Sequence, residues 1–220
     1  NVRDRIKSLL DNKSLHEIGI FAGTAQYNLD GNLKSFRPAN FILGRGTINK
    51  ENVVIGGDDF TVRGGAADAS IREKQIMAEQ MANELQIPLI RLIEGTGGGG
   101  SVKSIDTEER TYIPANPGWE WVVDNLSTIP VIALGLGPVA GLGAARLVTS
   151  HFSIMVENIS QLFVAGPPVV KRLGEDLTKE ELGGSEIHSK NGAVDIFTKS
   201  ENEAFEITRK ILSYLPPSVY

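Results

Sequence analysis

Two clusters of glycine residues are the part of this sequence whose residue types and spacing could do chemistry. The chain contains 24 glycines, and ten of them lie between Gly95 and Gly143. The clusters, Gly95–Ser101 and Gly135–Gly143, each follow an apolar run that is typical of a buried strand. Glycine leaves backbone N–H groups unshielded. N–H groups that converge on one point stabilise a carbonyl oxygen that becomes an enolate, and losing one donor typically costs about 10²–10³ in rate. The spacing alone leaves open the alternative that both clusters are tight packing turns.

Side chains that could act as a base, a nucleophile or a metal ligand are not grouped in the sequence. His16, His151 and His188 lie far apart without metal-ligand spacing or a triad signature, so we expect each to be structural or exposed. Asp58 and Asp59 would point to opposite faces of a strand, and we expect a turn or a solvated edge there. Any base would therefore come from the substrate, a cofactor or another chain, and no metal site is expected.

The glycine clusters do not fit nucleotide-binding motifs. A phosphate-binding P-loop needs glycine directly before its lysine, and Val102 occupies that place before Lys103. The dinucleotide fingerprint needs a third glycine, and the second cluster has Ala140 in its place. A nucleotide-binding fold is therefore poorly supported.

Composition limits the remaining function classes. The chain has 220 residues, 41% of them hydrophobic, which suits one large domain better than two. Its formal net charge of −5 has the wrong sign for holding nucleic acid by bulk charge. The absence of cysteine excludes disulfides and thiol catalysis. No apolar run is long enough to cross a bilayer, and the amino end lacks both a signal-peptide core and an initiator Met. We therefore expect a processed or excised chain with no membrane partner, in the cytoplasm or, in a eukaryote, the mitochondrial matrix.

The elements that would position the two clusters alternate between helix and strand. Apolar runs and apolar periodicity predict, in chain order, a helix at 2–10, a hairpin of strands at 41–48 and 53–57, a helix at 68–85, strands at 88–93 and 129–134, a helix at 144–150, a strand at 152–156 and a last helix after a capping box at 200–203. The hairpin would have a four-residue turn, Asn49–Asn52. This alternation predicts an α/β domain with a largely parallel sheet covered on both faces.

The sequence also resembles a known family over nearly its whole length, from about Arg3 to Pro217. The matching segments occur in order: Asp59–Gly65, Thr96–Gly99, Gly137–Gly141, Phe163–Val170, Glu180–Gly184 with His188, and Leu212–Pro216. They are similar to the amino-terminal domain of the carboxyltransferase (beta) subunit of biotin-dependent acyl-CoA carboxylases, in the crotonase-like superfamily. Several ordered motifs are far more specific than any single glycine pair.

This resemblance implies a fold, a reaction and partners. The fold would be the crotonase-like (ClpP/crotonase) β-β-α spiral, with residues 1–220 forming a single acyl-CoA-binding domain. A companion carboxyl-terminal domain, not in this chain, would hold carboxybiotin, and the active site would form between domains of different subunits. Carboxyl would pass from carboxybiotin to the enolate of an acyl-CoA, with the biotin urea removing the α-proton. The implied partners are a biotin carboxyl carrier or biotin carboxylase subunit and further copies of the carboxyltransferase domains.

The resemblance also implies site residues. The glycine pair that holds the thioester oxyanion in the family falls on Gly141 and Leu142, and the first cluster would contribute Gly98 and Gly99. The expected cofactor-binding residues are Gly64, Gly65, Gly97, Gly137 and Ala140. Two positions depart from the family pattern: Leu142 replaces the second glycine, and Gly100 replaces an arginine.

Two other function classes remain open at this point. An enoyl-CoA hydratase or isomerase of the crotonase type usually needs acidic residues near the substrate, and none lies between Gly141 and Ala145. A non-catalytic CoA-binding or assembly domain is the second alternative, because the departures at Leu142 and Gly100 affect positions that contact substrate in the family.

Overall fold

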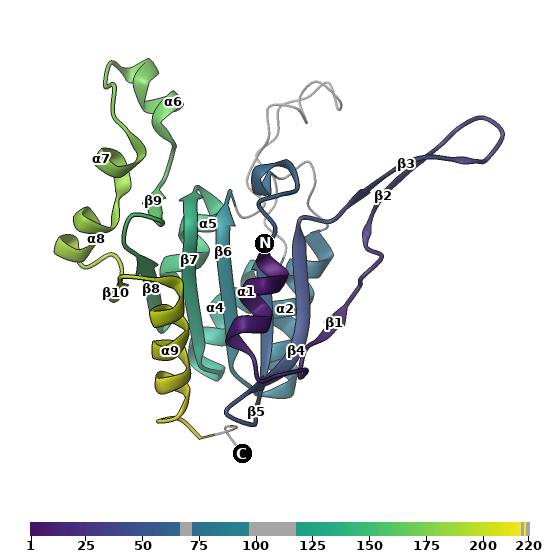
Figure 1. The fold of residues 1–220 in the computed structure, drawn as a ribbon, viewed down its shortest axis with the longest axis horizontal. Helices are drawn as coiled ribbons and strands as arrows, with labels where there is room; N and C mark the ends of the chain where they lie inside the picture. The colour runs from purple at the N-terminus through teal and green to yellow at the C-terminus, as the bar shows by residue number, and fades with distance from the viewer. Residues whose placement is uncertain (67–71, 97–117, 217, 219–220) are drawn as a thin grey trace.

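The chain is built around a mixed eight-stranded β-sheet (Figure 1). The computed structural model describes residues 1–66, 72–96, 118–216 and 218. The strands of the main sheet are β1 (His16–Ile18), β4 (Phe41–Ile48), β5 (Glu51–Asp58), β6 (Leu89–Gly95), β7 (Val131–Ala140), β8 (Phe152–Val156) and β10 (Ile196–Thr198), in spatial order, with β9 (Gln161–Phe163) beside the end of β7. Strands β5, β6, β7, β8 and β10 run parallel, while β1 and β4 are antiparallel to their neighbours. The predicted largely parallel α/β sheet is confirmed.

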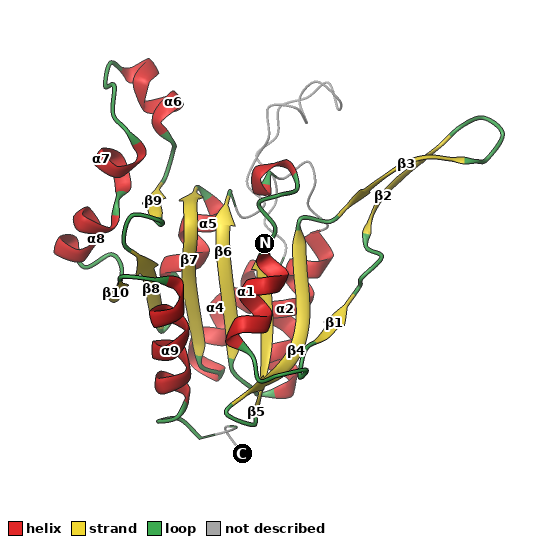
Figure 2. Cartoon of the chain, viewed as in Figure 1, coloured by secondary structure: helices red, strands yellow, loops and turns green. Residues whose placement is uncertain are grey.

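Helices cover both faces of this sheet (Figure 2). The long helices are α1 (Val2–Leu9), α2 (Arg72–Leu85), α4 (Trp119–Thr128), α5 (Leu142–Val148) and α9 (Glu201–Leu212). On one face, Ile6 of α1 and Phe205 of α9 pack with strand residues such as Ile90 in one buried cluster. On the other face, Ala78 of α2 and Leu147 of α5 pack in separate clusters against the same strands. Because both faces are buried, the central strands are almost continuously apolar.

The hairpin between β4 and β5 has a tighter turn than expected. Strand β5 begins at Glu51, so only Asn49 and Lys50 form the turn, with φ values of 54° and 71°. Two consecutive residues in the left-handed backbone conformation form the turn type that matches the twist of a β-hairpin. The carboxylate of Asp11 accepts the N–H groups of Asn49 and Lys50 at 3.2 and 2.8 Å. The prediction of a four-residue turn was wrong because the side chain of Asp11 supports this turn from outside the hairpin.

Strand β7 is longer than the sequence indicated. The predicted strand ended at Leu134, before the second glycine cluster and the helix predicted at 144–150, but β7 continues through that cluster to Ala140. Its last three residues pair with β9, a three-residue strand that sequence periodicity did not indicate. Glycine in the second cluster therefore serves close packing within a strand as well as the turn that follows it.

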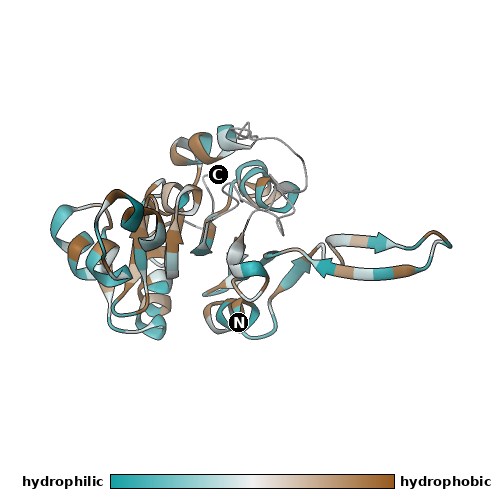
Figure 3. Cartoon of the chain, turned by 90° about the horizontal axis from the view of Figure 1, so that it is seen from above, coloured by the Kyte–Doolittle hydropathy of each residue, from teal (hydrophilic) through white to brown (hydrophobic). Residues whose placement is uncertain are grey.

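Two segments project from opposite sides of the sheet in Figure 1. One is the hairpin of β2 (Gly23–Tyr27) and β3 (Leu33–Pro38), which extends far from the body when seen from above (Figure 3). The other contains α6 (Pro167–Val170), η3 (Lys171–Leu173), α7 (Lys179–Gly183) and α8 (Ser185–Asn191).

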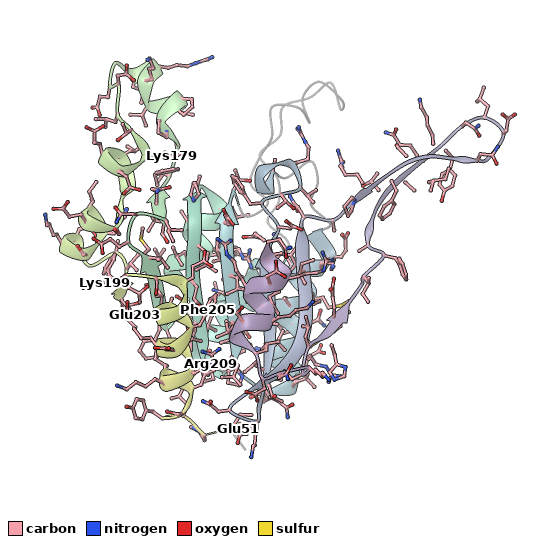
Figure 4. All side chains as sticks on the ribbon, in the orientation of Figure 1. Glu51, Lys179, Lys199, Glu203, Phe205 and Arg209 are labelled. Atoms are coloured by element: carbon pink, nitrogen blue, oxygen red, sulfur yellow. The ribbon has the colours of Figure 1, made fainter. Side chains whose placement is uncertain are left out.

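The start of α9 differs slightly from the predicted capping box. The hydroxyl of Ser200 accepts the N–H of Glu203, as predicted, but the Glu203 carboxylate accepts the N–H of Lys199 at 2.7 Å rather than that of Ser200 (Figure 4).

Within the described ranges, no helix combines the length and apolar character needed to cross a membrane.

Candidate active site

Gly95, where the first glycine cluster begins, lies beside the second glycine cluster because strands β6 and β7 are parallel neighbours. The register pairs Leu92 of β6 with Leu134 of β7, and Gly95 with Val139. The arrowheads of β6 and β7 accordingly end side by side (Figure 2). In parallel α/β sheets, ligands bind outside the carboxyl ends of the strands. This edge is therefore the candidate active site.

Thr96, the residue after β6, connects three loops at this edge. Its carbonyl oxygen accepts the N–H of Gly143 at 3.0 Å, and its hydroxyl donates to the carbonyl oxygen of Gly65 at 3.0 Å. The short helix η1 (Arg63–Gly65) is thereby joined to the end of β6, and the end of β6 to the start of α5.

Gly65 and Gly95 allow two backbone segments to touch. A Cβ atom on Gly65 would lie 2.9 Å from the carbonyl oxygen of Glu94, and one on Gly95 would lie 2.8 Å from that of Gly64. Gly64, Gly65 and Gly95 also have positive φ values of 59°, 70° and 94°. No other residue type combines this backbone conformation with this close approach. The structure therefore places Gly64 and Gly65, two of the expected cofactor-binding residues, at the candidate site.

Gly141 forms the turn between β7 and α5, with φ 57° and ψ −119°. Its N–H donates to the carbonyl oxygens of Phe163 and Val164, at 3.2 and 3.1 Å. From the sequence we expect this N–H to face a thioester, but in the structure it holds the last residue of β9 and the residue that follows it. Gly141 thus determines the path of the chain at the site, and its own N–H is engaged.

Leu142 and Gly143 differ in what their N–H groups contact. The Gly143 N–H is taken by Thr96, whereas the Leu142 N–H has no acceptor among the described residues. Of the three consecutive N–H groups, the one at Leu142 is therefore available to a ligand. The replacement of glycine by leucine at this position leaves the backbone donor in place.

Gly137 and Ala140 lie on β7, before the turn. A Cβ atom on Gly137 would lie 2.4 Å from a carboxylate oxygen of Glu94, so this glycine makes room for a neighbouring side chain. Ala140 is half-buried and pairs with Phe163 of β9. Both positions shape the end of β7. The other expected site residues, Gly97, Gly98 and Gly99, and the departure at Gly100 lie outside the described residues.

The side chain of Glu94, near the carboxyl end of β6, is bound by Arg5 on the face of the sheet that α1 and α9 cover. Arg5 of α1 donates to it at 2.6 Å and also to Glu201 of α9 and to the carbonyl oxygen of Leu136. Burial raises the pKa of Glu94, and the adjacent Arg5 partly offsets this effect. The carboxylate and its arginine tie α1 and α9 to the sheet.

A buried cluster of charged residues under α5 was missed in the sequence analysis. Asp58 and Asp59 are only 4% and 7% exposed, so the expected solvated edge was wrong. Burial raises the pKa of Asp58 to about 6, with Arg146 acting in the opposite direction. Arg91, an arginine inside an otherwise apolar predicted strand, was the signal that could have revealed the cluster: it is 1% exposed and forms two hydrogen bonds with Glu79.

Two of the three histidines are held by backbone groups. His151 accepts the N–H of Val131 at 3.1 Å, and His188 contacts the carbonyl oxygen of Leu162 at 2.7 Å, so both are held by the backbone. In the part of the chain that the structure describes, no three His, Asp or Glu side chains lie together as metal ligands would.

Comparisons with known proteins show the family of the chain. The family model described as the carboxyl transferase domain matches residues 1–219. The chain is 34% identical to the biotin-dependent acetyl-/propionyl-coenzyme A carboxylase beta5 subunit of Mycobacterium tuberculosis, over 98% of this chain and 39% of that protein. It is 32% identical to the methylmalonyl-CoA carboxyltransferase 12S subunit of Propionibacterium freudenreichii, over 97% of this chain and 40% of that protein.

Solved structures lead to the same family. A transcarboxylase 12S structure, described as a hexamer with hydrolysed methylmalonyl-coenzyme A bound, superposes with a TM-score of 0.80 at 30% identity and covers 98% of this chain and 42% of that one. The chain thus spans about two fifths of the length of these relatives. The predicted crotonase-like α/β fold is confirmed. With the family model and these relatives matching almost every residue, the chain belongs to the carboxyl transferase domain family.

Proposed function

We propose that residues 1–220 form the amino-terminal, acyl-CoA-binding half of a biotin-dependent carboxyltransferase. The observation that carries this proposal is the match of the carboxyl transferase domain over residues 1–219, together with relatives that are about two and a half times as long. The unmatched length of those relatives leaves room for a companion carboxyl-terminal domain. The transcarboxylase 12S structure, in which hydrolysed methylmalonyl-coenzyme A is bound, supports acyl-CoA as the ligand.

The residues of this chain would hold the thioester of the acyl-CoA. The Leu142 N–H, which has no acceptor among the described residues, lies where β6 and β7 end, and it would stabilise the oxygen as the thioester becomes an enolate. Gly141 allows the turn that aims this donor. Gly98 and Gly99, with Gly97 beside them, follow β6 in the sequence and would supply the second set of N–H groups.

A group other than the side chains of this chain would remove the proton from the α-carbon of the acyl-CoA. Among the described residues at this edge, the carboxylates of Asp58 and Glu94 are buried or paired with arginine. Carboxybiotin, carried by a partner protein and bound against the companion domain, would supply the carboxyl group. The contribution of this half is to bind the acyl-CoA, orient its α-carbon and stabilise the enolate oxygen.

Other subunits would complete the site. A biotin carboxyl carrier or biotin carboxylase subunit would deliver the biotin, and further copies of the chain would assemble through the carboxyltransferase domains. The hexamer described for transcarboxylase 12S supports the second of these partners.

Carboxyl transfer by the complete enzyme tests the proposal. The protein, with its companion domain, a biotin carboxylase and the biotin carrier, is supplied with labelled bicarbonate and ATP, and label is followed into acetyl-, propionyl- and methylcrotonyl-CoA. We expect label in at least one ester and calorimetric binding of that ester. Hydration of an enoyl-CoA without biotin would instead identify a crotonase-type hydratase, and absence of both turnover and binding would identify a non-catalytic domain.

A further inference from the structure

Four charged side chains form a buried cluster between α5, α2 and the sheet. Asp58, Glu79, Arg91 and Arg146 are each 4% exposed or less. Two carboxylates and two guanidinium groups balance in charge when all are ionised. Replacing a buried ion pair with apolar residues is often neutral or stabilising, so packing alone does not explain such a cluster.

One part of the cluster holds the carboxyl end of α5. The Nη1 atom of Arg91 donates to the carbonyl oxygens of Arg146 and Thr149, at 3.1 and 2.5 Å. The other nitrogens of Arg91 bind both carboxylate oxygens of Glu79 at 2.8 and 2.7 Å. The amide of Asn125 on α4 donates to Glu79 at 3.1 Å. The end of α5 is thus fixed to strand β6 and to helices α2 and α4.

The other part of the cluster holds the middle of α5. Arg146 projects from α5 between two carboxylates, 3.7 Å from Asp58 and 3.8 Å from Glu79, and lies over the ring of Phe41. Its Nη1 atom is buried and makes no hydrogen bond within the described residues. Asp58 in turn accepts the N–H of Glu94, at 3.2 Å, at the end of β6. The charge on Asp58 is thus what links Arg146 to the edge of the sheet.

These contacts act on the proposed oxyanion donor through a short, rigid path. Leu142 precedes Arg146 by four residues, one turn, on the same helix. The start of α5 is held by the hydrogen bond between Gly143 and Thr96. A rotation or shift of α5 would therefore turn the Leu142 N–H away from its target. Misplacement of a reacting group by about 1 Å costs about 100-fold in rate.

We propose that the pair of Asp58 and Arg146, supported by Glu79 and Arg91, is a positioning device that orients α5 and so aims the Leu142 N–H at the thioester oxygen. The inference rests on the proposed function for the identity of the ligand. Neither residue contacts the substrate in this account, so both are positioning residues and not catalytic ones.

The environment of Asp58 makes this device sensitive to pH. The groups that face it are Arg146 from α5, Gln75 from α2, and the N–H and carboxylate of Glu94 from β6. Burial raises the pKa of Asp58 to about 6, Arg146 and the hydrogen bonds lower it, and the Glu94 carboxylate adds to the increase. Protonation below pH 6 removes the charge that holds Arg146, so we expect carboxyl transfer to decrease there.

Steady-state kinetics of the complete enzyme test the proposal. We expect Asp58→Asn to reduce kcat by about 10- to 100-fold at pH 8, with KM for the acyl-CoA within about twofold. The wild-type kcat should fall below pH 6 toward that of the variant, which should lack this acidic limb. Arg146→Lys should retain more activity than Arg146→Gln. The double variant Asp58→Asn/Arg146→Gln should be no slower than the slower single variant, because both changes break the same pair.

A control and a second measurement separate this inference from the proposed function. Glu17→Gln breaks the hydrogen-bonded pair of Glu17 with Arg3, far from α5, and should leave kcat unchanged. Hydrogen exchange of peptides covering α5 should become faster in Asp58→Asn relative to exchange of peptides covering α9, whether or not the wild type transfers carboxyl. A wild-type pH profile and kcat in Asp58→Asn, or unchanged exchange in α5, would overturn the inference. A wild type without transfer would overturn only the proposed function.

Discussion

The variant Asp58→Asn should make the protein more stable at pH 8, although we expect it to slow the reaction. Burial raises the pKa of Asp58 from its ordinary value of 3.8 to about 6 in the folded protein. Below about pH 4 the carboxyl is protonated in both states, so it makes no difference to the free energy of unfolding. As the pH rises through 6, the folded protein must ionise a buried group that the unfolded chain ionises readily. The free energy of unfolding therefore decreases by the amount that corresponds to the raised pKa of Asp58.

The size of this effect follows from the pKa difference. The interval from 3.8 to about 6, at about 1.4 kcal/mol for each pKa unit, gives about 3 kcal/mol above pH 7. Asparagine resembles the protonated carboxyl and avoids that cost. With a urea dependence of about 2–3 kcal/mol per M, the unfolding midpoint should increase by about 1 M at pH 8 and by almost nothing at pH 4.

Urea unfolding followed by tryptophan fluorescence measures this difference. Asp11→Asn is a control of opposite sign, because hydrogen bonds from Thr47 and from the turn at Asn49 and Lys50 lower the pKa of Asp11. That variant should be less stable than wild type at pH 8. A lower midpoint for Asp58→Asn at pH 8 would refute the reasoning, since it would mean that the attraction of Arg146 outweighs the cost of burying the charge.

Three further variants test other parts of the structure. Gly141→Ala should lower the free energy of unfolding in urea by about 1–3 kcal/mol, because φ 57° and ψ −119° strain any residue with a Cβ. The same variant should also have a lower kcat. The control Gly192→Ala, at φ 73° and far from the site, should lower stability and leave kcat unchanged. Gly137→Ala should destabilise the fold by about 1–3 kcal/mol, measured in the same way, since its Cβ would lie 2.4 Å from a carboxylate oxygen of Glu94. Arg91→Leu should cost about 3–5 kcal/mol at pH 8, because it removes both hydrogen bonds of Arg91 to the buried carboxylate of Glu79 and leaves that carboxylate paired only with the more distant Arg146, at 3.8 Å; a midpoint equal to wild type would contradict that expectation.

Much of the fold was predictable from apolar patterning. The runs that became β6 and β8, and the periodicity that became α2 and α9, are long or regular enough to identify the element type. Element ends were less predictable. The end of β7 depends on pairing with β9, and the turn at Asn49 and Lys50 depends on a carboxylate that lies 38 residues earlier in the chain. Neither contact leaves a local signal in the sequence.

The approach of the carboxyl ends of β6 and β7 was predictable, but the hydrogen bonding there was not. Parallel pairing of β6 and β7 brings Gly95, where the first cluster begins, beside the second cluster, as two neighbouring apolar runs indicated. Which N–H remains available depends on the carbonyl oxygens of Phe163, Val164 and Thr96, which only the tertiary structure brings to Gly141 and Gly143. The charged cluster left one signal in the sequence, Arg91 within an apolar run, but its members, Asp58, Glu79, Arg91 and Arg146, come from four separate elements that only the tertiary structure brings together.

The backbone N–H of Leu142 is the centre of this account, and nuclear magnetic resonance observes it directly. The complete enzyme, labelled with ¹⁵N-leucine and otherwise deuterated, is titrated with a non-reactive thioester analogue of the acyl-CoA and, separately, with free CoA. Leu142→Met identifies the resonance by its disappearance. We expect the Leu142 amide proton to move downfield with the thioester and to stay in place with free CoA. An unchanged Leu142 resonance at saturating thioester would contradict the assignment of this N–H as the donor to the substrate oxygen.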